Sequence, residues 1–170
     1  CANDTSISAG ADCTAPCPDV VISATDNCPG LHVTQSPPVD VPLDLGSHMV
    51  TVTATDAAGN TSGCTTHVYV RDTTRPVVHC SADITRSNDP GQCGAVASFT
   101  STATDNCPGV TVTCSPASGA TFPRGVTSVR CLAADAAGSS NECVFTVTVL
   151  DQQPPGITCP ANVTVSSADG

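Results

Sequence analysis

Apolar and polar side chains alternate along several stretches of this chain, with Val and Thr as the commonest pair. The pattern is clearest at Met49–Thr53, Thr66–Val70, Val110–Cys114 and Val144–Val149. A period of two is typical of β-strands with one buried face, and Thr suits the exposed face of such a strand. No window has the apolar spacing of an amphipathic helix. The pattern therefore predicts an all-β protein.

Turn-forming residues separate the predicted strands. Gly, Pro and Asn gather at four places: Cys28–Gly30, Ser36–Pro38, Ala58–Asn60 and Asp89–Gly91. Such residues favour tight turns. Short strands at this spacing predict β-sandwiches, with about seven strands in each.

One stretch, A-T-D-N-C-P-G, occurs at Ala24–Gly30 and again, unchanged, at Ala103–Gly109, 79 positions later. The same offset relates further pairs: Cys1 and Cys80, Cys80 and Cys159, Cys64 and Cys143, and the D-A-A-G of Asp56–Gly59 and that of Asp135–Gly138. A fixed period of this length indicates a repeat protein. We assign the chain as follows: unit 1 to residues 1–72, a linker to 73–75, unit 2 to 76–151, and a second linker with the first strand of a further repeat to 152–170.

The last segment matches the opening of unit 2, since Ile157–Val165 resembles Val78–Ile84. Two interpretations are open. The chain is an excerpt of a longer array, or this strand is donated to a neighbouring chain by β-strand addition. Proline directly follows the first linker, at Pro76, and lies in the second, at Pro154 and Pro155. Proline holds the preceding residue extended. The units are therefore expected to form a stiff rod.

Large side chains are scarce, because the chain has 3 Phe, 1 Tyr and no Trp, whereas it has 12 Cys. Small cores of this kind usually need covalent cross-links. Such a high density of cysteines indicates an oxidising compartment, outside the cell or in a periplasm, and we expect the protein to be secreted or on the cell surface. Zinc binding is disfavoured, because the chain lacks the C-x-x-C pairs typical of zinc sites.

The formal charge of −10 disfavours nucleic acid as a partner. The sequence has no apolar run of membrane length. Glu142 is the only glutamate, and the four histidines are scattered. We find no spacing typical of a catalytic site, so the protein is not expected to be an enzyme.

Several motifs occur in order along the chain: P-G-Q-C-G-A-V, A-T-D-N-C, F-P-R-G-V-T-S-V, D-A-A-G and E-C-V-F-T-V-T-V-L-D. This series resembles the hyalin repeat, or HYR domain. Unit 1 departs from it at Leu43–Gly46, where unit 2 has F-P-R-G. The resemblance implies an immunoglobulin-like β-sandwich, an extracellular protein, a role in adhesion and no catalysis. Fold likeness alone does not establish function.

Comparison of the units suggests a disulfide pattern. Cys114 and Cys131 correspond to Gln35 and Val52 in unit 1, and the absence of both together indicates one bridge. The first and last strands of such sandwiches run side by side, which brings their cysteines together. The predicted pairs are Cys1–Cys64, Cys80–Cys143 and Cys114–Cys131, with Cys13–Cys28 and Cys93–Cys107 as local clamps.

Two cysteines, Cys17 and Cys159, remain without a predicted partner. In a longer array Cys159 would pair within the next unit. Alternatively, an intermolecular Cys17–Cys159 bridge would link successive subunits into a covalent filament.

Acidic and amide side chains recur in the loops and linkers. The candidate calcium ligands are Asp26, Asn27, Asp56, Asp72, Asp105, Asn106, Asp135 and Asp151. Calcium takes six to eight oxygen ligands, so a linker Asp and a loop of the next unit could share one ion. The alternative is that these residues close turns through Asx hydrogen bonds. Three N-x-S/T sequons, at Asn3, Asn60 and Asn162, are candidate glycosylation sites.

These observations favour an extracellular structural or adhesive protein, whose units form a stiff acidic rod or filament. Its expected partners are copies of itself, joined head to tail, by strand addition or by disulfides, or other extracellular proteins. The alternative is a module of a cell-surface protein that binds a protein or a glycan. A third reading is an accessory segment of a secreted enzyme.

Overall fold

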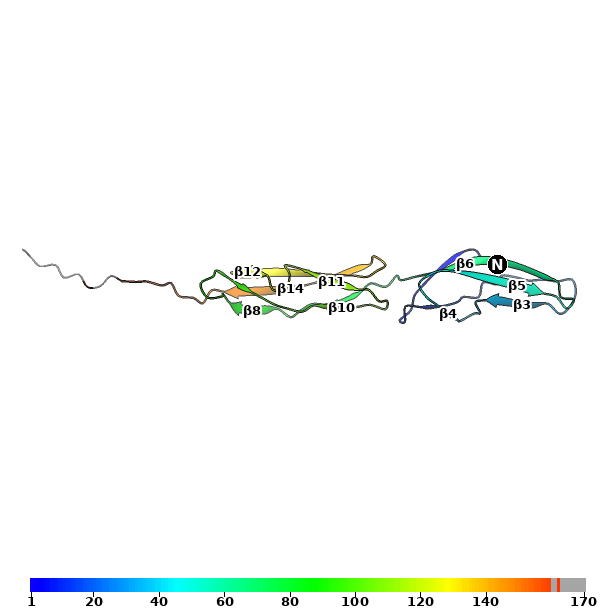
Figure 1. Ribbon diagram of the computed structural model, residues 1–170, viewed down its shortest axis with the longest axis horizontal. Coiled ribbons are helices and arrows are strands. Elements are labelled where there is room, and N and C mark those ends of the chain that lie inside the picture. Colours follow the sequence, from blue (N-terminus) through cyan, green and yellow to red (C-terminus); the bar gives the residue numbers. More distant parts are fainter. Residues whose placement is uncertain (160–161, 163–170) are drawn as a thin grey trace, which may run out of the picture.

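The computed structural model describes residues 1–159 and residue 162, and all their regular secondary structure is β-strand. The predicted all-β class is confirmed. The strands form two groups that lie end to end along the long axis of the molecule (Figure 1). Unit 1 contains β1 (Thr5–Ser8), β2 (Ala15–Pro16), β3 (His32–Ser36), β4 (Pro42–Leu43), β5 (Gly46–Thr55) and β6 (Thr61–Arg71). Unit 2 contains β7 (Val77–His79), β8 (Ile84–Ser87), β9 (Gly94–Val96), β10 (Thr102–Thr104), β11 (Thr111–Ser115), β12 (Thr121–Pro123), β13 (Gly125–Ala134) and β14 (Ser140–Leu150).

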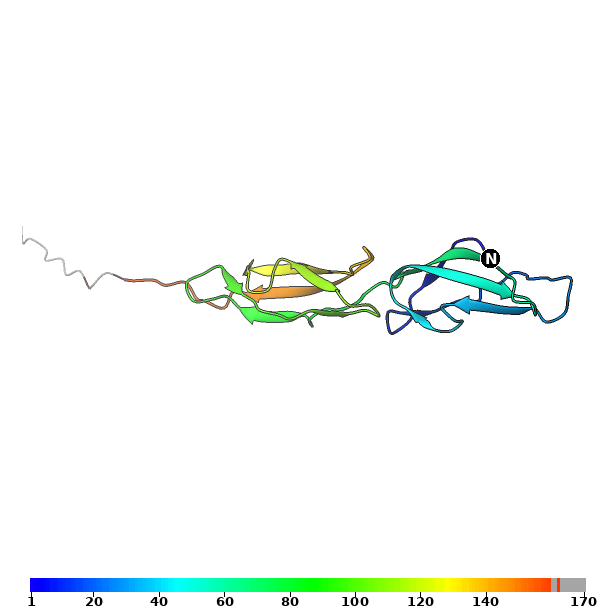
Figure 2. The same ribbon diagram turned by 45° about the vertical axis from the view of Figure 1, so that its right-hand side comes forward.

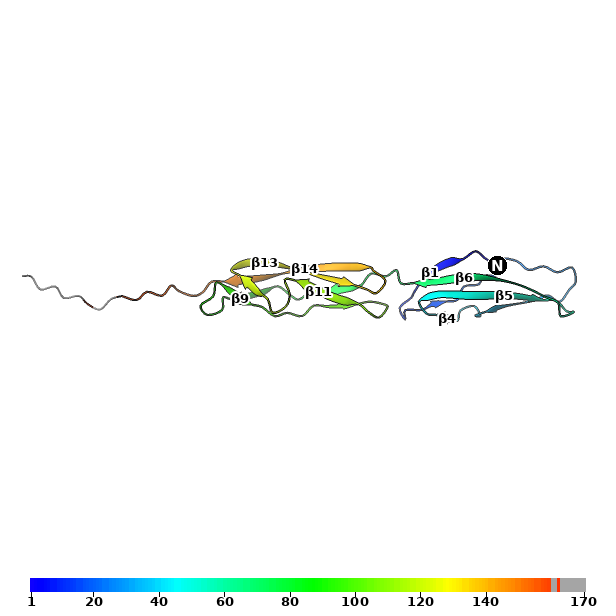
Figure 3. The same cartoon turned by 45° about the horizontal axis from the view of Figure 1, so that its top comes forward.

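Each unit is built on one four-stranded sheet, ordered β1-β6-β5-β3 in unit 1 and β8-β14-β13-β11 in unit 2. Smaller pairs complete the units, β2-β4 in unit 1 and β9-β12 and β7-β10 in unit 2. Strands at equivalent places in the two sheets are related by the 79-residue offset, as β5 and β13 are. Figure 3 shows β1 beside β6 in unit 1 and β11, β13 and β14 together in unit 2.

The first strand of each large sheet runs parallel to the last strand. Thr5 pairs with Val68, and Ile84 pairs with Val147. Along β6 the alternation seen in the sequence becomes one buried face, with Thr66, Val68 and Val70 at most 3% exposed. The residues between them point outward, as a pleated strand requires.

The two cores differ in side-chain size. Phe122 and Phe145 are buried in unit 2, and their counterparts in unit 1 are Leu43 and Thr66. In unit 2 Phe99 packs edge-on against Phe145, with ring centroids 4.9 Å apart. The core of unit 1 therefore has no buried aromatic ring and is built mainly from Val and Ala, with Leu43 and Cys17.

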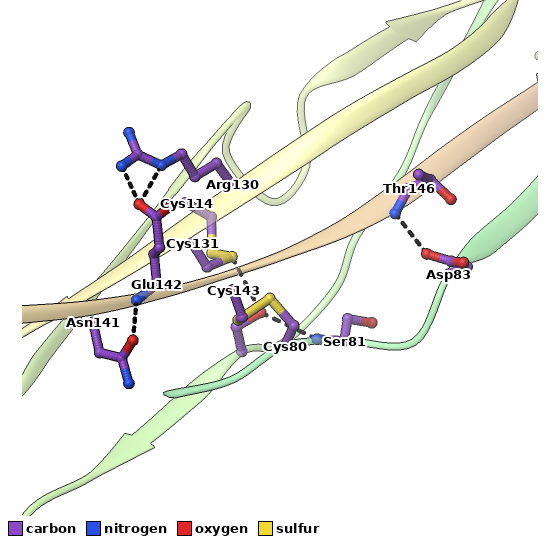
Figure 4. The surroundings of a disulfide bond; sticks show 11 residues. Cys80, Ser81, Asp83, Cys114, Arg130, Cys131, Asn141, Glu142, Cys143 and Thr146 are labelled. Atoms are coloured by element: carbon purple, nitrogen blue, oxygen red, sulfur yellow. Dashed lines mark hydrogen bonds and ion pairs between the residues drawn. A yellow bond between two sulfur atoms is a disulfide. The ribbon is translucent and has the colours of Figure 1, made fainter. Parts of the chain in front are cut away.

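Three of the predicted disulfides form inside the units. The Cα–Cα distances are 5.8 Å for Cys1–Cys64, 5.9 Å for Cys80–Cys143 and 4.0 Å for Cys114–Cys131. The parallel pairing of the first and last strands brings the first two pairs together. Figure 4 shows both bridges of unit 2 close to one another across β14 and β13.

Cys17 lies inside unit 1 and is 0% exposed. Burial raises the pKa of its thiol. Burial of this sulfur disfavours the intermolecular Cys17–Cys159 bridge, which stays a prediction. The amide of Gln35 donates to Cys17 Sγ over 3.4 Å and to Pro18 O over 2.9 Å. Gln35 thus anchors this core where unit 2 has Cys114.

Residues 151–159 follow β14 without joining a sheet. The expected strand at 157–165 falls largely outside the described residues, so its pairing stays a prediction. Among the described residues, no helix has the length and apolar character of a membrane span.

Candidate functional site

The linker between the two units begins at Asp72, directly after β6. Asp72 Oδ1 accepts a hydrogen bond of 3.0 Å from the backbone of Thr74. At the other end of the linker Pro76 is fully buried, and Asn141 Nδ2 donates to its carbonyl over 3.2 Å. Asp151 makes the same turn after β14, where its Oδ1 accepts from Gln153 N over 3.2 Å. Each unit thus ends in an Asx turn that fixes the direction of the chain.

A disulfide joins unit 1 to unit 2. Cys13 pairs with Cys107, with a Cα–Cα distance of 4.8 Å, across 94 positions of sequence. Beside it Asn106 Nδ2 donates to the Gly10 carbonyl over 3.0 Å. The predicted clamps Cys13–Cys28 and Cys93–Cys107 are therefore wrong, and Cys28 and Cys93 are exposed free thiols.

The strand pairing explains this correction. The loop that holds Cys13 follows β1, whose last residue pairs with Arg71 at the end of β6. Cys28 lies in the loop before β3, which is next to the start of β6. The eleven residues of β6 separate these ends, by about 35 Å, whereas a disulfide needs Cα atoms roughly 6 Å apart. Figure 2 shows the two loops at opposite ends of unit 1.

The two repeated motifs pack against each other in both units. Gly30 and Gly109 end the A-T-D-N-C-P-G stretches, with φ of 101° and 102°. A Cβ on Gly30 would lie 3.0 Å from that of Ala57, and one on Gly109 would lie 3.3 Å from that of Ala136. Only glycine combines this conformation with so close an approach. The motif is therefore a corner of the fold, held on the D-A-A-G turn.

Three of the eight candidate calcium ligands come together at the joint. Oxygens of Asp72, Asp105 and Asp135 all lie within 4.8 Å of one another. Asp72 comes from the end of unit 1, whereas Asp105 and Asp135 come from the two packed corner loops of unit 2. We call these three residues the junction triad. At an effective dielectric constant of about 20, two like charges at this distance repel by roughly 3 kcal/mol.

Several oxygens at the joint are buried without a hydrogen-bond partner. They are both carboxylate oxygens of Asp105, Oδ2 of Asp135 and the side-chain oxygen of the neighbouring Asn106. Asp135 is only 9% exposed, and its other oxygen accepts from Ser139 N over 2.7 Å. The ion pairs found in the described residues lie elsewhere, at His67–Asp4, Arg86–Asp89 and Arg130–Glu142.

The other candidate ligands do not join a cluster in the described part of the chain. Asp26 and Asn27 are exposed, and Asp26 Oδ2 accepts from Cys28 N over 3.3 Å. Asp56 binds Asn60 through both its oxygens, over 2.8 Å to the backbone and 2.7 Å to the side-chain amide. These hydrogen bonds, the side-chain one first, hold the pKa of Asp56 below its ordinary value. At Asp26, Asp56 and Asp151 the turn interpretation describes the contacts.

The candidate glycosylation sites Asn3, Asn60 and Asn162 are exposed. The amide of Asn60 is already engaged by Asp56, whereas the rest of the Asn162 sequon lies outside the described residues. Whether they carry glycans stays a prediction.

Neither the Cys13–Cys107 bond nor the hydrogen bond from Asn106 to the Gly10 carbonyl was predicted from the sequence. The positions of the cysteines do contain a signal for the bond between the units. In each unit the two cysteines taken for a clamp lie in loops at opposite ends of the sandwich, once the first strand is placed parallel to the last. End-to-end stacking then brings the second cysteine of unit 1, Cys13, to the third cysteine of unit 2, Cys107.

Comparison with known proteins agrees with the motifs. Residues 71–149 match the family model of the HYR domain. The chain is 33% identical over 127 residues to hyalin of Lytechinus variegatus, and 39% identical over 127 residues to hyalin of Strongylocentrotus purpuratus. These alignments cover 71% and 70% of the chain but only 24% and 11% of the two hyalins.

Solved structures similar to the chain have low sequence identity to it. A human protocadherin-24 EC1-2 structure is 17% identical with a TM-score of 0.40, and covers 87% of this chain and 95% of its own. Fibronectin(III)-like modules of Clostridium thermocellum CbhA are 12% identical with a TM-score of 0.38, and cover 93% of this chain and 96% of their own.

Proposed function

We propose that this chain is a non-catalytic, extracellular structural or adhesive repeat protein that forms a stiff rod. The match of residues 71–149 to the HYR domain and the similarity to hyalins support an adhesive role. The four disulfides among the described residues support an oxidising, extracellular location. The net charge of −10 keeps such rods soluble and apart until specific contacts form.

The observation that carries this proposal is the Cys13–Cys107 bond between the units. A linker of a few residues would by itself let two sandwiches swing. The bond and the Asn106–Gly10 hydrogen bond give the joint a second attachment away from the linker. Two attachment points restrict bending as well as separation, so the pair acts as one rigid segment.

The same bond supplies a way to lengthen the rod with further copies of the chain. By the 79-residue offset, Cys28 is the counterpart of Cys107, and Cys93 lies one position beyond the counterpart of Cys13. Both thiols are exposed, and both lie in loops at the ends of their units that face away from the joint. Cys93 of one chain would then pair with Cys28 of the next, which repeats the internal joint.

This step balances as a thiol–disulfide exchange. Cys93 thiolate attacks an external disulfide such as oxidised glutathione, and one glutathione leaves as a thiolate. The Cys28 thiolate of a second chain then attacks the mixed disulfide and releases the second glutathione. Two protein thiols are oxidised and one small disulfide is reduced, and the two protons of the protein thiols pass to the departing glutathione thiolates.

Refolding in a glutathione redox buffer tests the proposal. We expect a ladder of oligomers on non-reducing gels, and straight rods by electron microscopy, both abolished by reductant. Cys28→Ser or Cys93→Ser should stop the ladder at the dimer or below. Cys159→Ser is the matched control, because it also removes an exposed free thiol, and it should leave the ladder intact. A wild-type chain that stays monomeric, or a ladder that depends on Cys159, would contradict head-to-tail assembly through this pair.

A further inference from the structure

We infer that the joint between units 1 and 2 is a divalent-cation site of the calcium class, formed by the carboxylates of the junction triad, Asp72, Asp105 and Asp135. The site lies within one chain, so it does not depend on assembly into longer rods. It goes beyond a rod held by disulfides, because it makes the joint sensitive to a dissolved ion.

The fold brings the three carboxylates together from separate strands. Asp72 follows β6, Asp105 follows β10, and Asp135 follows β13. The contact between Gly109 and Ala136 holds the two loops of unit 2 against each other. The Asx turn at Asp72 and the Cys13–Cys107 bond hold unit 1 against them. The cluster is thus fixed in place by contacts other than its own.

The bonding state of these side chains points to a ligand. Asp135 is more than nine-tenths buried, and its Oδ2 has no hydrogen-bond partner. Both oxygens of Asp105 are likewise buried and unpaired. Within the described residues no lysine, arginine or histidine forms an ion pair with the triad. Unpaired buried carboxylates are strongly unfavourable, so a bound cation accounts for an arrangement that hydrogen bonds do not.

Unit 1 shows how the same loops look without such a site. There Asp56 takes the place of Asp135, and Asn60 takes the place of Ser139. The Asn60 amide occupies the second oxygen of Asp56, whereas the shorter Ser139 leaves that of Asp135 free. Asp26, the counterpart of Asp105, is exposed. In unit 2, by contrast, the corner loops meet Asp72 of unit 1 at the joint.

The donor set identifies the class of ion. All three side chains offer hard carboxylate oxygens, and the group contains no His or Cys, so it suits calcium and not zinc. Calcium takes six to eight oxygens in flexible geometry, which three carboxylates and several waters can supply. Magnesium is smaller and keeps most of its own water, so we expect it to bind more weakly here.

Titration calorimetry of the full chain with calcium chloride tests the inference. We expect one ion per chain, with a dissociation constant on the order of 10⁻⁴ to 10⁻³ M, as in other extracellular modules. Asp105→Asn and Asp135→Asn should each weaken binding by about tenfold or more, since each removes a charged ligand. Asp26→Asn is the matched control, because it makes the same change in the equivalent loop of unit 1, and it should bind like the wild type.

Thermal unfolding keeps the test decisive if a variant is unstable. Calcium should raise the melting temperature of the wild type above that in a chelator, whereas Asp105→Asn should melt at the same temperature in both. The inference would be overturned if the wild type showed neither binding heat nor a shift in melting temperature at millimolar calcium. An equal loss of affinity in Asp26→Asn would also overturn it, because binding would then reflect overall charge. Neither outcome bears on the disulfide ladder, which is measured separately.

Discussion

At the scale of single residues, Asn60 controls the ionisation of Asp56. Its side-chain amide is the largest of the contacts that lower the pKa of Asp56. Because the pKa is lower in the folded state, this contact stabilises the fold above the unfolded pKa. That stabilisation is lost as the pH falls through the folded pKa, below about 4.

We therefore expect Asn60→Ala to raise the pKa of Asp56 toward its ordinary value. The variant should lose part of its stability at neutral pH and show a weaker dependence of stability on pH in the acidic range. NMR titration of the Asp56 carboxyl carbon measures the pKa directly. A pKa of Asp56 unchanged by the substitution would show that the backbone contacts alone lower it.

The roles of individual residues were predictable where the bond is local. Asp and Asn in turns, and the glycine that ends each corner motif, follow from short-range backbone chemistry. The partner of Cys13 did not follow, because it lies 94 positions away in another unit. Sequence spacing favoured Cys28, which is near in the chain but at the opposite end of the sandwich.

At the scale of the strands, the Cys114–Cys131 bridge ties β11 to β13. These residues are directly opposite in the sheet, and Cys131 is fully buried. The loop between them spans 17 positions, which corresponds to about 3 kcal/mol in the chain-entropy model. Unit 1 has Gln35 and Val52 at the same pair of positions and folds with hydrogen bonds from Gln35 instead.

We expect the double variant Cys114→Ala, Cys131→Ala to lower the free energy of unfolding of unit 2 by about 3 kcal/mol. Urea denaturation of the full chain, followed by the separate transition of unit 2, measures the change. Cys93→Ala is the control, because it removes a cysteine that forms no bridge within the chain, and it should alter the stability of the monomer by less than about 0.5 kcal/mol. If both variants behave alike, the bridge does not restrict the unfolded chain as proposed.

The strands with clear alternation were predictable, and β5, β6, β11 and β14 lie where the pattern indicated. The short strands β2, β4, β9 and β12 have two or three residues each, too few to show a period. They form through pairing with distant segments, which a local pattern does not reveal. The junction triad was predictable only as part of a larger list, because its assembly depends on how one unit meets the next.

At the scale of the whole molecule, the joint decides whether two sandwiches act as one body. Figure 1 shows them end to end, with the linker and the loops of both units meeting between them. Parallel pairing of first and last strands sends the chain into each unit near one end and out near the other. This topology lets identical joints recur along a line, which suits a repeat protein with a mechanical role.

We expect the stiffness of this joint to depend on the Cys13–Cys107 bond. The double variant Cys13→Ser, Cys107→Ser removes the bond between the units and leaves the bridges inside them. The five residues from Asp72 to Pro76 would then be the main connection, and they can span roughly 17 Å when extended. We expect small-angle X-ray scattering in a chelator to show a wider range of molecular lengths than for the wild type.

The double variant of Cys114 and Cys131 is the control, because it loses a bridge within unit 2 and keeps the joint, so its distribution of lengths should match the wild type. If the junction triad also holds a cation, calcium should narrow the distribution of the Cys13 and Cys107 variant. An identical distribution for wild type and variant in the chelator would mean that the linker and the Asn106–Gly10 contact suffice to hold the units, and that the disulfide protects the joint without stiffening it.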